Sequence, residues 1–333
     1  MHCIAMRRFT HAPSRQLRLR AAAAAALAVS LFTVACRDRT AVLTPGEHHL
    51  AVPGGRIWYR VVGSGPGTPV VLLHGGPGVP SYYLNPLAAL ADERPVIFYD
   101  QLGTGRSDTT TDTTLWTVPH FVAELDSLRR ALGLREFHLY GHSWGTMLAS
   151  EYVLAHPDGV RSLVLASPAL STARWLQDAE SLLTTLPDSI QRAVATHTAD
   201  GTFEDPDYQS AVMAYYHRYV ARREPWSADL DSAFAGLNPA LYGYMWGPSE
   251  FTATGTLRDF DVTDSLWLIR VPTLVMGGSD DEAPPATVRY YASLIAGAEA
   301  AIIPDAAHVT MHDNPEETIR VIREFLRRAD GRR

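Results

Sequence analysis

The sequence predicts an α/β fold, in which a mostly parallel central sheet is covered by helices on both faces. Short runs typical of strands alternate with segments of helical spacing along most of the 333 residues. This alternation stops between about residues 169 and 268, where the pattern is mostly helical, and then resumes. The two observations indicate one core, formed by residues 46–168 and 269–330, with a helical cap at 169–268.

The elements of the core follow one another in a regular order. Because the runs are apolar or rich in β-forming residues, strands are expected at 56–62, 70–73, 96–99, 137–140, 162–166, 273–276 and 301–303. By their spacing and their start and stop signals, helices are expected at 120–132, 144–155 and 315–326. Ligands bind at the carboxyl ends of strands in open sheets of this kind, so the cap is expected to cover that edge.

Composition and charge exclude several classes of protein. With 46% hydrophobic and 20% charged residues, the chain has the composition of an ordinary globular protein. The formal charge is −7 and no basic stripe is present, so nucleic acid is not an expected partner. No cofactor or metal is implied, because no group of histidines and carboxylates has ligand spacing along the sequence.

Residues 1–36 have the pattern of an export signal. A segment with several arginines precedes the charge-free run Ala21–Ala35, which is shorter than the roughly 20 apolar residues that a spanning helix needs. The run ends in Phe-Thr-Val-Ala-Cys at Cys36, which resembles the lipobox of bacterial lipoproteins. We therefore expect an exported protein, periplasmic or anchored to a membrane through Cys36; a plain signal peptide or an uncleaved anchor is the alternative. Cys3 and Cys36 both lie in this leader, so the mature domain forms no internal disulfide.

A serine flanked by glycines follows the strand expected at 137–140. The segment Gly141–Gly145 reads GHSWG and fits the G-x-S-x-G nucleophile elbow of α/β-hydrolases, with a strand before it and a helix after it. The glycines leave room for the sharp turn that exposes the serine hydroxyl. Ser143 is therefore the predicted nucleophile.

A serine hydroxyl needs a base, and the base needs an acid that orients it. In α/β-hydrolases the chain order is serine, acid, histidine. His308 follows the strand at 301–303 and is the candidate base. Asp280 and Asp281 both follow the strand at 273–276, and spacing alone does not separate them.

A second glycine-rich segment, HGGPG at residues 74–78, follows the strand at 70–73. It resembles the motif that supplies one backbone N–H of an oxyanion hole, here assigned to Gly76. The second N–H comes from the residue after the nucleophile, Trp144.

Together with YDQLGTGRS at 99–107, these motifs resemble the proline iminopeptidase family of α/β-hydrolase serine peptidases. The resemblance spans roughly residues 56–326. It is most specific in the cap, where YMWGPSEFT at 244–252 and DVTD at 261–264 are similar to strings of the proline-specific members.

The resemblance implies several roles. The family's acid is the aspartate directly before a glutamate, which selects Asp281. The family holds the free α-amino group of its substrate with carboxylates, which fall on Glu250 and Glu282, with Tyr242 as a further candidate. The alternative for both glutamates is a solvated surface charge. The implied substrate is a small peptide or amino-acid amide with a free N-terminus.

The resulting functional prediction is a serine aminopeptidase that releases N-terminal proline or another small residue through an acyl-enzyme. The first alternative is an amino-acid amidase, esterase or lactonase on the same scaffold, because a fold does not fix a function. The second is a non-catalytic binding protein tethered to a membrane.

Overall fold

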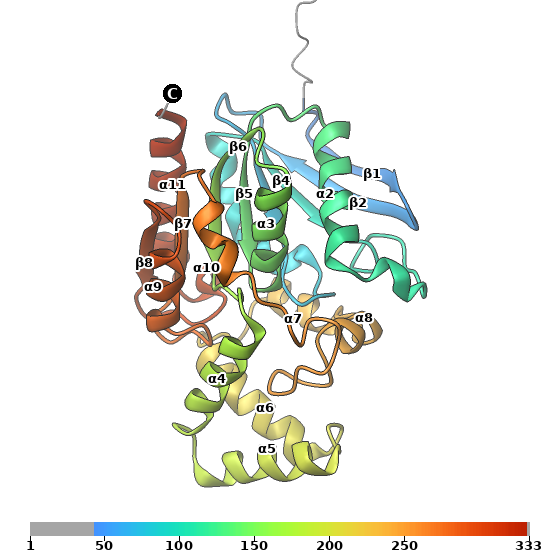
Figure 1. The fold of residues 1–333 in the computed structure, drawn as a ribbon, viewed down its shortest axis with the longest axis vertical. Coiled ribbons are helices and arrows are strands. Elements are labelled where there is room, and N and C mark those ends of the chain that lie inside the picture. The colour runs from blue at the N-terminus through green and yellow to red at the C-terminus, as the bar shows by residue number, and fades with distance from the viewer. Residues whose placement is uncertain (1–42, 332–333) are drawn as a thin grey trace, which may run out of the picture. The chain divides into compact units, whose positions relative to one another are not determined.

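A computed structural model describes residues 43–331, which contain a single eight-stranded sheet in the order β1-β2-β4-β3-β5-β6-β7-β8 (Figure 1). The strands from β3 to β8 pair in parallel, whereas β1 and β2 are antiparallel at one edge. The strand bounds are β1 Gly46–Val52, β2 Gly55–Val62, β3 Val70–Leu73, β4 Val96–Asp100, β5 Phe137–His142, β6 Val160–Ala166, β7 Thr273–Gly278 and β8 Glu299–Ile303. The predicted fold class is confirmed.

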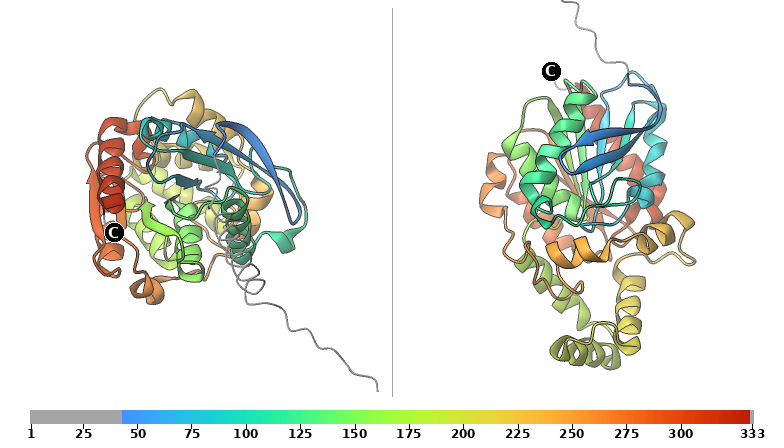
Figure 2. Two further views of the ribbon diagram at one scale, coloured as in Figure 1. Left: turned by 90° about the horizontal axis from the view of Figure 1, so that it is seen from above. Right: turned by 90° about the vertical axis from the view of Figure 1, so that its right-hand side faces the viewer.

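Helices pack on both faces of this sheet (Figures 1 and 2). Neighbouring strand residues point to opposite faces and belong to separate apolar clusters; Leu139 lies in one and Tyr140 in the other. Of the helices outside the cap, α2 Val118–Ala131, α3 Trp144–Ala155 and α9 Pro285–Ser293 contribute buried side chains to the cluster of Leu139. Also outside the cap, η1 Ser81–Asp92, α10 Thr310–Asp313 and α11 Pro315–Gly331 contribute to the cluster of Tyr140. The short helix η2 Thr113–Leu115 precedes α2.

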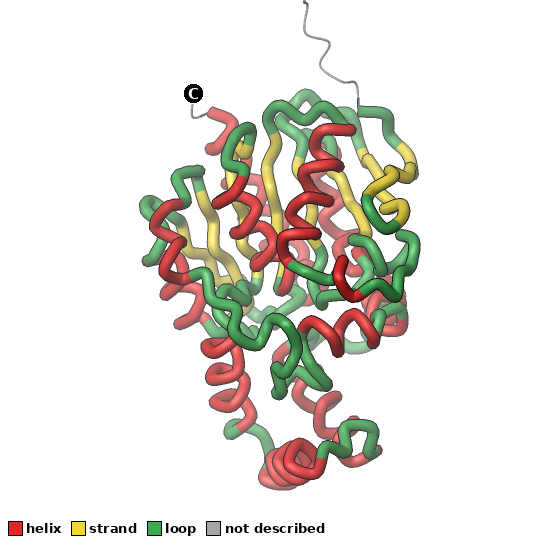
Figure 3. The backbone as a smooth tube through the Cα atoms, turned by 45° about the vertical axis from the view of Figure 1, so that its right-hand side comes forward, coloured by secondary structure: helices red, strands yellow, loops and turns green. Residues whose placement is uncertain are grey.

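The chain leaves the core after β6 and forms a helical layer beyond the carboxyl ends of the strands (Figures 1 and 3). Its helices are α4 Thr172–Leu183, α5 Asp188–Asp200, α6 Pro206–Tyr219, α7 Ala228–Ala235 and α8 Pro239–Met245. The outgoing and returning segments run side by side, because Thr172 N donates to Phe260 O and Val262 N donates to Leu170 O. The returning segment ends in η3 Thr263–Leu268, whose Leu266 is buried in the core.

In the core, the sequence missed β1, η1, α9 and the short helices η2 and α10. The exposed edge strand β1 carries Glu47, His48 and His49, so its apolar alternation is weak, and only its pairing with β2 defines it. Strands β5 and β7 also extend past their expected ends, because Gly141 and His142 continue the pairing with β6 and Gly277 and Gly278 continue that with β8.

The expected signal peptide, including Cys36, lies outside the described residues. Within residues 43–331, none of the helices is both apolar enough and long enough to traverse a bilayer.

The packing of α11 on the sheet is testable through one buried ring. Phe325 is 2% exposed, so Phe325→Ala should lower the free energy of unfolding by about 3 to 5 kcal/mol. Arg320→Ala, on the exposed side of the same helix, should leave it nearly unchanged. Urea unfolding of the two variants measures both values, and equal losses would contradict the packing.

Candidate active site

The turn between β5 and α3 holds Ser143 in a strained conformation. Its φ of 54° and ψ of −124° are rare for a residue with a side chain. The turn lies so close to β3 that a Cβ atom on Gly145 would lie 2.5 Å from the carbonyl oxygen of Leu73. Only glycine fits there, which explains the second glycine of the motif. Ser143 lines the cavity described below.

His308 and Asp281 form a buried hydrogen-bonded pair at the same edge of the sheet. His308 Nδ1 lies 2.9 Å from Asp281 Oδ1. Asp281 also accepts hydrogen bonds from Ser167 Oγ at 2.7 Å and from the backbone N–H groups of Gly278 and Ala283. Burial disfavours ionisation of Asp281, but the charge of His308 and these donors outweigh it and hold the pKa of Asp281 below its usual value. Asp281 therefore stays ionised and can orient the imidazole.

The neighbouring carboxylate of Asp280 has different partners. It forms an ion pair with Arg222 and accepts a hydrogen bond from Ser279 Oγ at 2.8 Å. The two adjacent aspartates, which spacing left unresolved, thus differ in position: Asp281 lies against the imidazole and Asp280 does not.

Ser143 and His308 line the same cavity without forming the hydrogen bond of a working pair. Among the described residues, no hydrogen bond joins the Ser143 hydroxyl to the ring of His308. His308 Nε2 lies instead 3.4 Å from Glu282 Oε1. Catalytic contacts often tighten only when substrate is bound.

A chain of hydrogen bonds connects the HGGPG loop to the backbone of His308. Gly75 N donates to the Tyr83 hydroxyl at 2.7 Å, and this hydroxyl donates to His142 Nδ1 at 2.9 Å. His142 Nε2 donates to the carbonyl oxygen of His308 at 2.9 Å, since a carbonyl can only accept. Burial, assisted by the charge of His308, lowers the pKa of His142 to about 3, so this ring stays neutral. The sequence placed His142 at the elbow but gave no signal for Tyr83.

The backbone N–H groups of Gly76 and Trp144 have no partner among the described residues, as donors of an oxyanion hole require. The neighbouring Gly75 N is already taken by Tyr83. The indole of Trp144 is fixed by Gln101 Oε1 at 2.9 Å, and Gln101 N donates to His74 Nε2 at 3.0 Å. The YDQLGTGRS segment thus supports both parts of the predicted oxyanion hole.

Glu250 and Glu282 lie inside the protein and are not solvated surface charges. Glu250 is half-buried and accepts hydrogen bonds from Trp175 Nε1 and from the Tyr242 hydroxyl, both at 3.0 Å. Glu282 is 4% exposed, and its Oε2 has no hydrogen-bond partner. Burial raises the pKa of both carboxyls, and the charges of Glu250 and Asp281 raise that of Glu282 further. The role of Trp175, which also packs edge-on against His308, was not predicted.

A cavity of about 860 Å³ joins these groups. Ser143, His308, Glu250 and Glu282 line it together with the HGGPG loop. The cap contributes large apolar or aromatic side chains, chiefly Phe203, Tyr208, Val212, Met213, Tyr216 and Phe234. Apart from the imidazoles of His142 and His308, the charged side chains that line the cavity are carboxylates, so the cavity favours positively charged ligands over anions.

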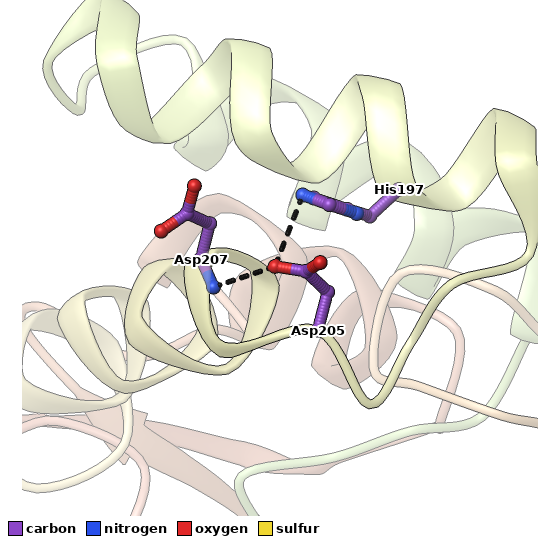
Figure 4. Close-up of side chains that lie close together, drawn as sticks. All are labelled: His197, Asp205 and Asp207. Carbon is purple, nitrogen blue, oxygen red and sulfur yellow. Dashed lines mark hydrogen bonds and ion pairs between the residues drawn. The ribbon is translucent and has the colours of Figure 1, made fainter.

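One group of possible metal ligands, unforeseen from the sequence, lies in the cap (Figure 4). Ligand atoms of His197, Asp205 and Asp207 lie within 4.8 Å of one another, because the turn between α5 and α6 brings them together. Asp205 Oδ1 accepts from Asp207 N at 2.9 Å and lies 3.6 Å from His197 Nε2. His197 Nδ1 contacts Thr202 Oγ1 at 2.7 Å. The bond from Asp207 N to Asp205 caps the start of α6, and the contact of His197 with Thr202 closes the turn after α5.

The fold and the arrangement of serine, histidine and aspartate define a serine hydrolase of the α/β-hydrolase class. Residues 68–315 match the family model described as alpha/beta hydrolase fold. A proline iminopeptidase of Heyndrickxia coagulans is 43% identical over 282 residues, which cover 84% of this chain and 98% of the relative. This chain belongs to the proline iminopeptidase family.

Two crystal structures are similar over most of the chain. The proline iminopeptidase of Mycobacterium smegmatis has a TM-score of 0.80 at 34% identity, covering 86% of this chain and 99% of that one. The protein VinJ has a TM-score of 0.82 at 37% identity, covering 86% of this chain and 100% of that one. The family predicted from the sequence is thereby confirmed.

The different positions of the two aspartates are testable. Asp281→Asn removes the charge that orients the imidazole and should lower kcat for a chromogenic ester by about 10³- to 10⁴-fold. Asp280→Asn, one residue away, should change kcat by less than about threefold. Steady-state kinetics with matched circular dichroism spectra measures both, and similar losses in the two variants would contradict the assignment of the acid.

Proposed function

We propose that the protein is a serine aminopeptidase that releases N-terminal proline or another small residue from peptides. The observation that carries this proposal is the pair Glu250 and Glu282, which line the cavity beside His308. A buried carboxyl oxygen without a partner, such as Glu282 Oε2, is costly unless a ligand supplies the donor. The α-ammonium of a peptide is such a donor, and that of N-terminal proline carries two N–H bonds, one for each carboxylate.

The proposed reaction has two halves. Ser143 Oγ attacks the carbonyl carbon of the first residue while His308 Nε2 takes its proton, and Asp281 stabilises the resulting imidazolium. The N–H groups of Gly76 and Trp144 bind the oxyanion. The C–N bond then breaks, His308 gives its proton to the leaving amine, and an aminoacyl-enzyme remains. Water then attacks the ester carbonyl while His308 takes its proton. The bond between the carbonyl carbon and Ser143 Oγ breaks, His308 returns the proton to Oγ, and the free amino acid leaves.

Because the ammonium and the scissile carbonyl of one residue share a single Cα, carboxylates next to His308 restrict cleavage to the first peptide bond. Membership of an enzyme family argues against a non-catalytic binding protein. The esterases and lactonases of similar fold are only 20–23% identical, so they support the fold and not the esterase or lactonase alternative.

Substrates with a free or blocked amino group test the proposal. Prolyl arylamide should be hydrolysed, whereas its N-acetyl form should lose at least about 100-fold in kcat/KM, because it cannot form charge-assisted bonds to the carboxylates. Ser143→Ala should remove turnover of the free substrate by about 10⁴-fold or more. Equal hydrolysis of the two substrates would favour an esterase or general amidase.

The leader supports a second proposal, namely that the enzyme is exported and anchored through a lipid on Cys36. Full-length protein expressed in a bacterium should sediment with membranes and incorporate labelled palmitate. Cys36→Ala should abolish the label, and Cys3→Ala should not. Label that persists in Cys36→Ala would overturn the lipid anchor.

A further inference from the structure

Glu282 contacts the catalytic base as well as the cavity. Its Oε1 lies 3.4 Å from His308 Nε2, while its Oε2 is buried without a partner. The other ring nitrogen, His308 Nδ1, is bonded to Asp281. Both nitrogens of the imidazole therefore face carboxyl groups, and Trp175 packs against the ring at a centroid distance of 5.6 Å.

This contact bears directly on the chemistry, because His308 must accept the proton of Ser143 with its Nε2 lone pair. Two buried carboxyl groups, Asp281 and Glu282, lie against the imidazole, and Glu282 is the one that faces Nε2. Burial, with the charges of Glu250 and Asp281, raises the pKa of Glu282 well above its usual value and so favours its protonated carboxyl. The oxygen Oε1 of this carboxyl lies 3.4 Å from Nε2, so a proton on it competes with the Ser143 hydroxyl for the Nε2 lone pair.

We propose that Glu282 keeps the base of the free enzyme in an unproductive contact, and that the α-ammonium of the substrate releases it. The inference rests on the proposed aminopeptidase function and extends it. The ammonium brings a positive charge to Glu250 and Glu282, so Glu282 ionises and binds it. The carboxyl proton of Glu282 leaves to solvent, and the Nε2 lone pair of His308 becomes free to accept the Ser143 proton.

This arrangement makes Glu282 a specificity-determining residue that acts on the rate of the chemical step. A substrate whose amino group is blocked can occupy the apolar cavity, but it leaves His308 in contact with Glu282. Such a substrate is discriminated against in kcat and not only in KM. Glu250 lacks this effect, because its two oxygens are bonded to Trp175 and Tyr242.

A pair of variants separates this role from simple ammonium binding. Glu282→Ala and Glu282→Gln both remove the carboxylate, but only glutamine can still donate to Nε2. The readout is the rate at which diisopropyl fluorophosphate, which is uncharged, labels Ser143, followed by mass spectrometry of the intact protein. Glu282→Ala should be labelled at least about tenfold faster than Glu282→Gln, and equal rates or the reverse order would overturn the proposal.

A measurement on the unchanged enzyme does not depend on how the variants fold. Pyrrolidinium, a cation without a carbonyl group, should speed labelling severalfold at millimolar concentration, whereas the uncharged isostere tetrahydrofuran should not. The acceleration should be absent in Glu282→Ala. If pyrrolidinium slows labelling or leaves it unchanged, Glu282 does not restrain the base.

Turnover of prolyl arylamide by the same preparation distinguishes failure of the proposed aminopeptidase function from failure of the proposed role of Glu282. Absence of turnover would overturn the aminopeptidase function itself. Normal turnover without acceleration of labelling by pyrrolidinium would overturn only the role of Glu282.

Discussion

The burial of several acidic groups around one imidazole is the constraint on which the site depends. Asp281 tolerates burial because the charge of His308 and three hydrogen-bond donors compensate its own charge. Glu250 has two donors, and Glu282 has an oxygen with none. The three carboxyl groups are therefore compensated to different degrees, and Glu282, whose Oε2 has no donor, faces the cavity. A cationic substrate supplies the missing positive charge, which links substrate recognition to the availability of the His308 lone pair.

The fold brings these acidic groups and the imidazole together from distant parts of the chain. Parallel strands end at one edge of the sheet, so the segments after β5, β7 and β8 bring Ser143, Asp281 and His308 together. The cap adds Glu250 and the aromatic walls of the cavity. Burial of Asp281 and Glu282 lowers the local dielectric, which strengthens their charge interactions. Tyr83 and His142 then tie the HGGPG loop to the backbone of His308.

Different features of the molecule were predictable to different degrees. The fold class and the family were predicted correctly, because strand periodicity and the motifs are local properties of the chain. Strand β1 was missed, because an exposed edge strand depends on pairing more than on its own sequence. Tyr83, Trp175 and Ser167 were missed as site residues, because nothing in their neighbourhoods distinguishes them from core residues. The group of His197, Asp205 and Asp207 was missed, because a turn brings it together.

The sequence by itself determined the elbow around Ser143 and the glycine loop, because steric limits on a sharp turn restrict which residues can stand there. It also determined the order of serine, acid and histidine, which is read directly along the chain. Spacing along the chain left Asp280 and Asp281 unresolved, and only the family resemblance selected Asp281. The tertiary structure places Asp281 against the imidazole and Asp280 against Arg222, because packing decides the directions in which adjacent side chains point. It alone brought Glu282 to the imidazole and left one oxygen of this carboxyl without a donor. Interactions between buried charges depend on the distance between them and on the local dielectric, and neither quantity can be read from the amino-acid sequence.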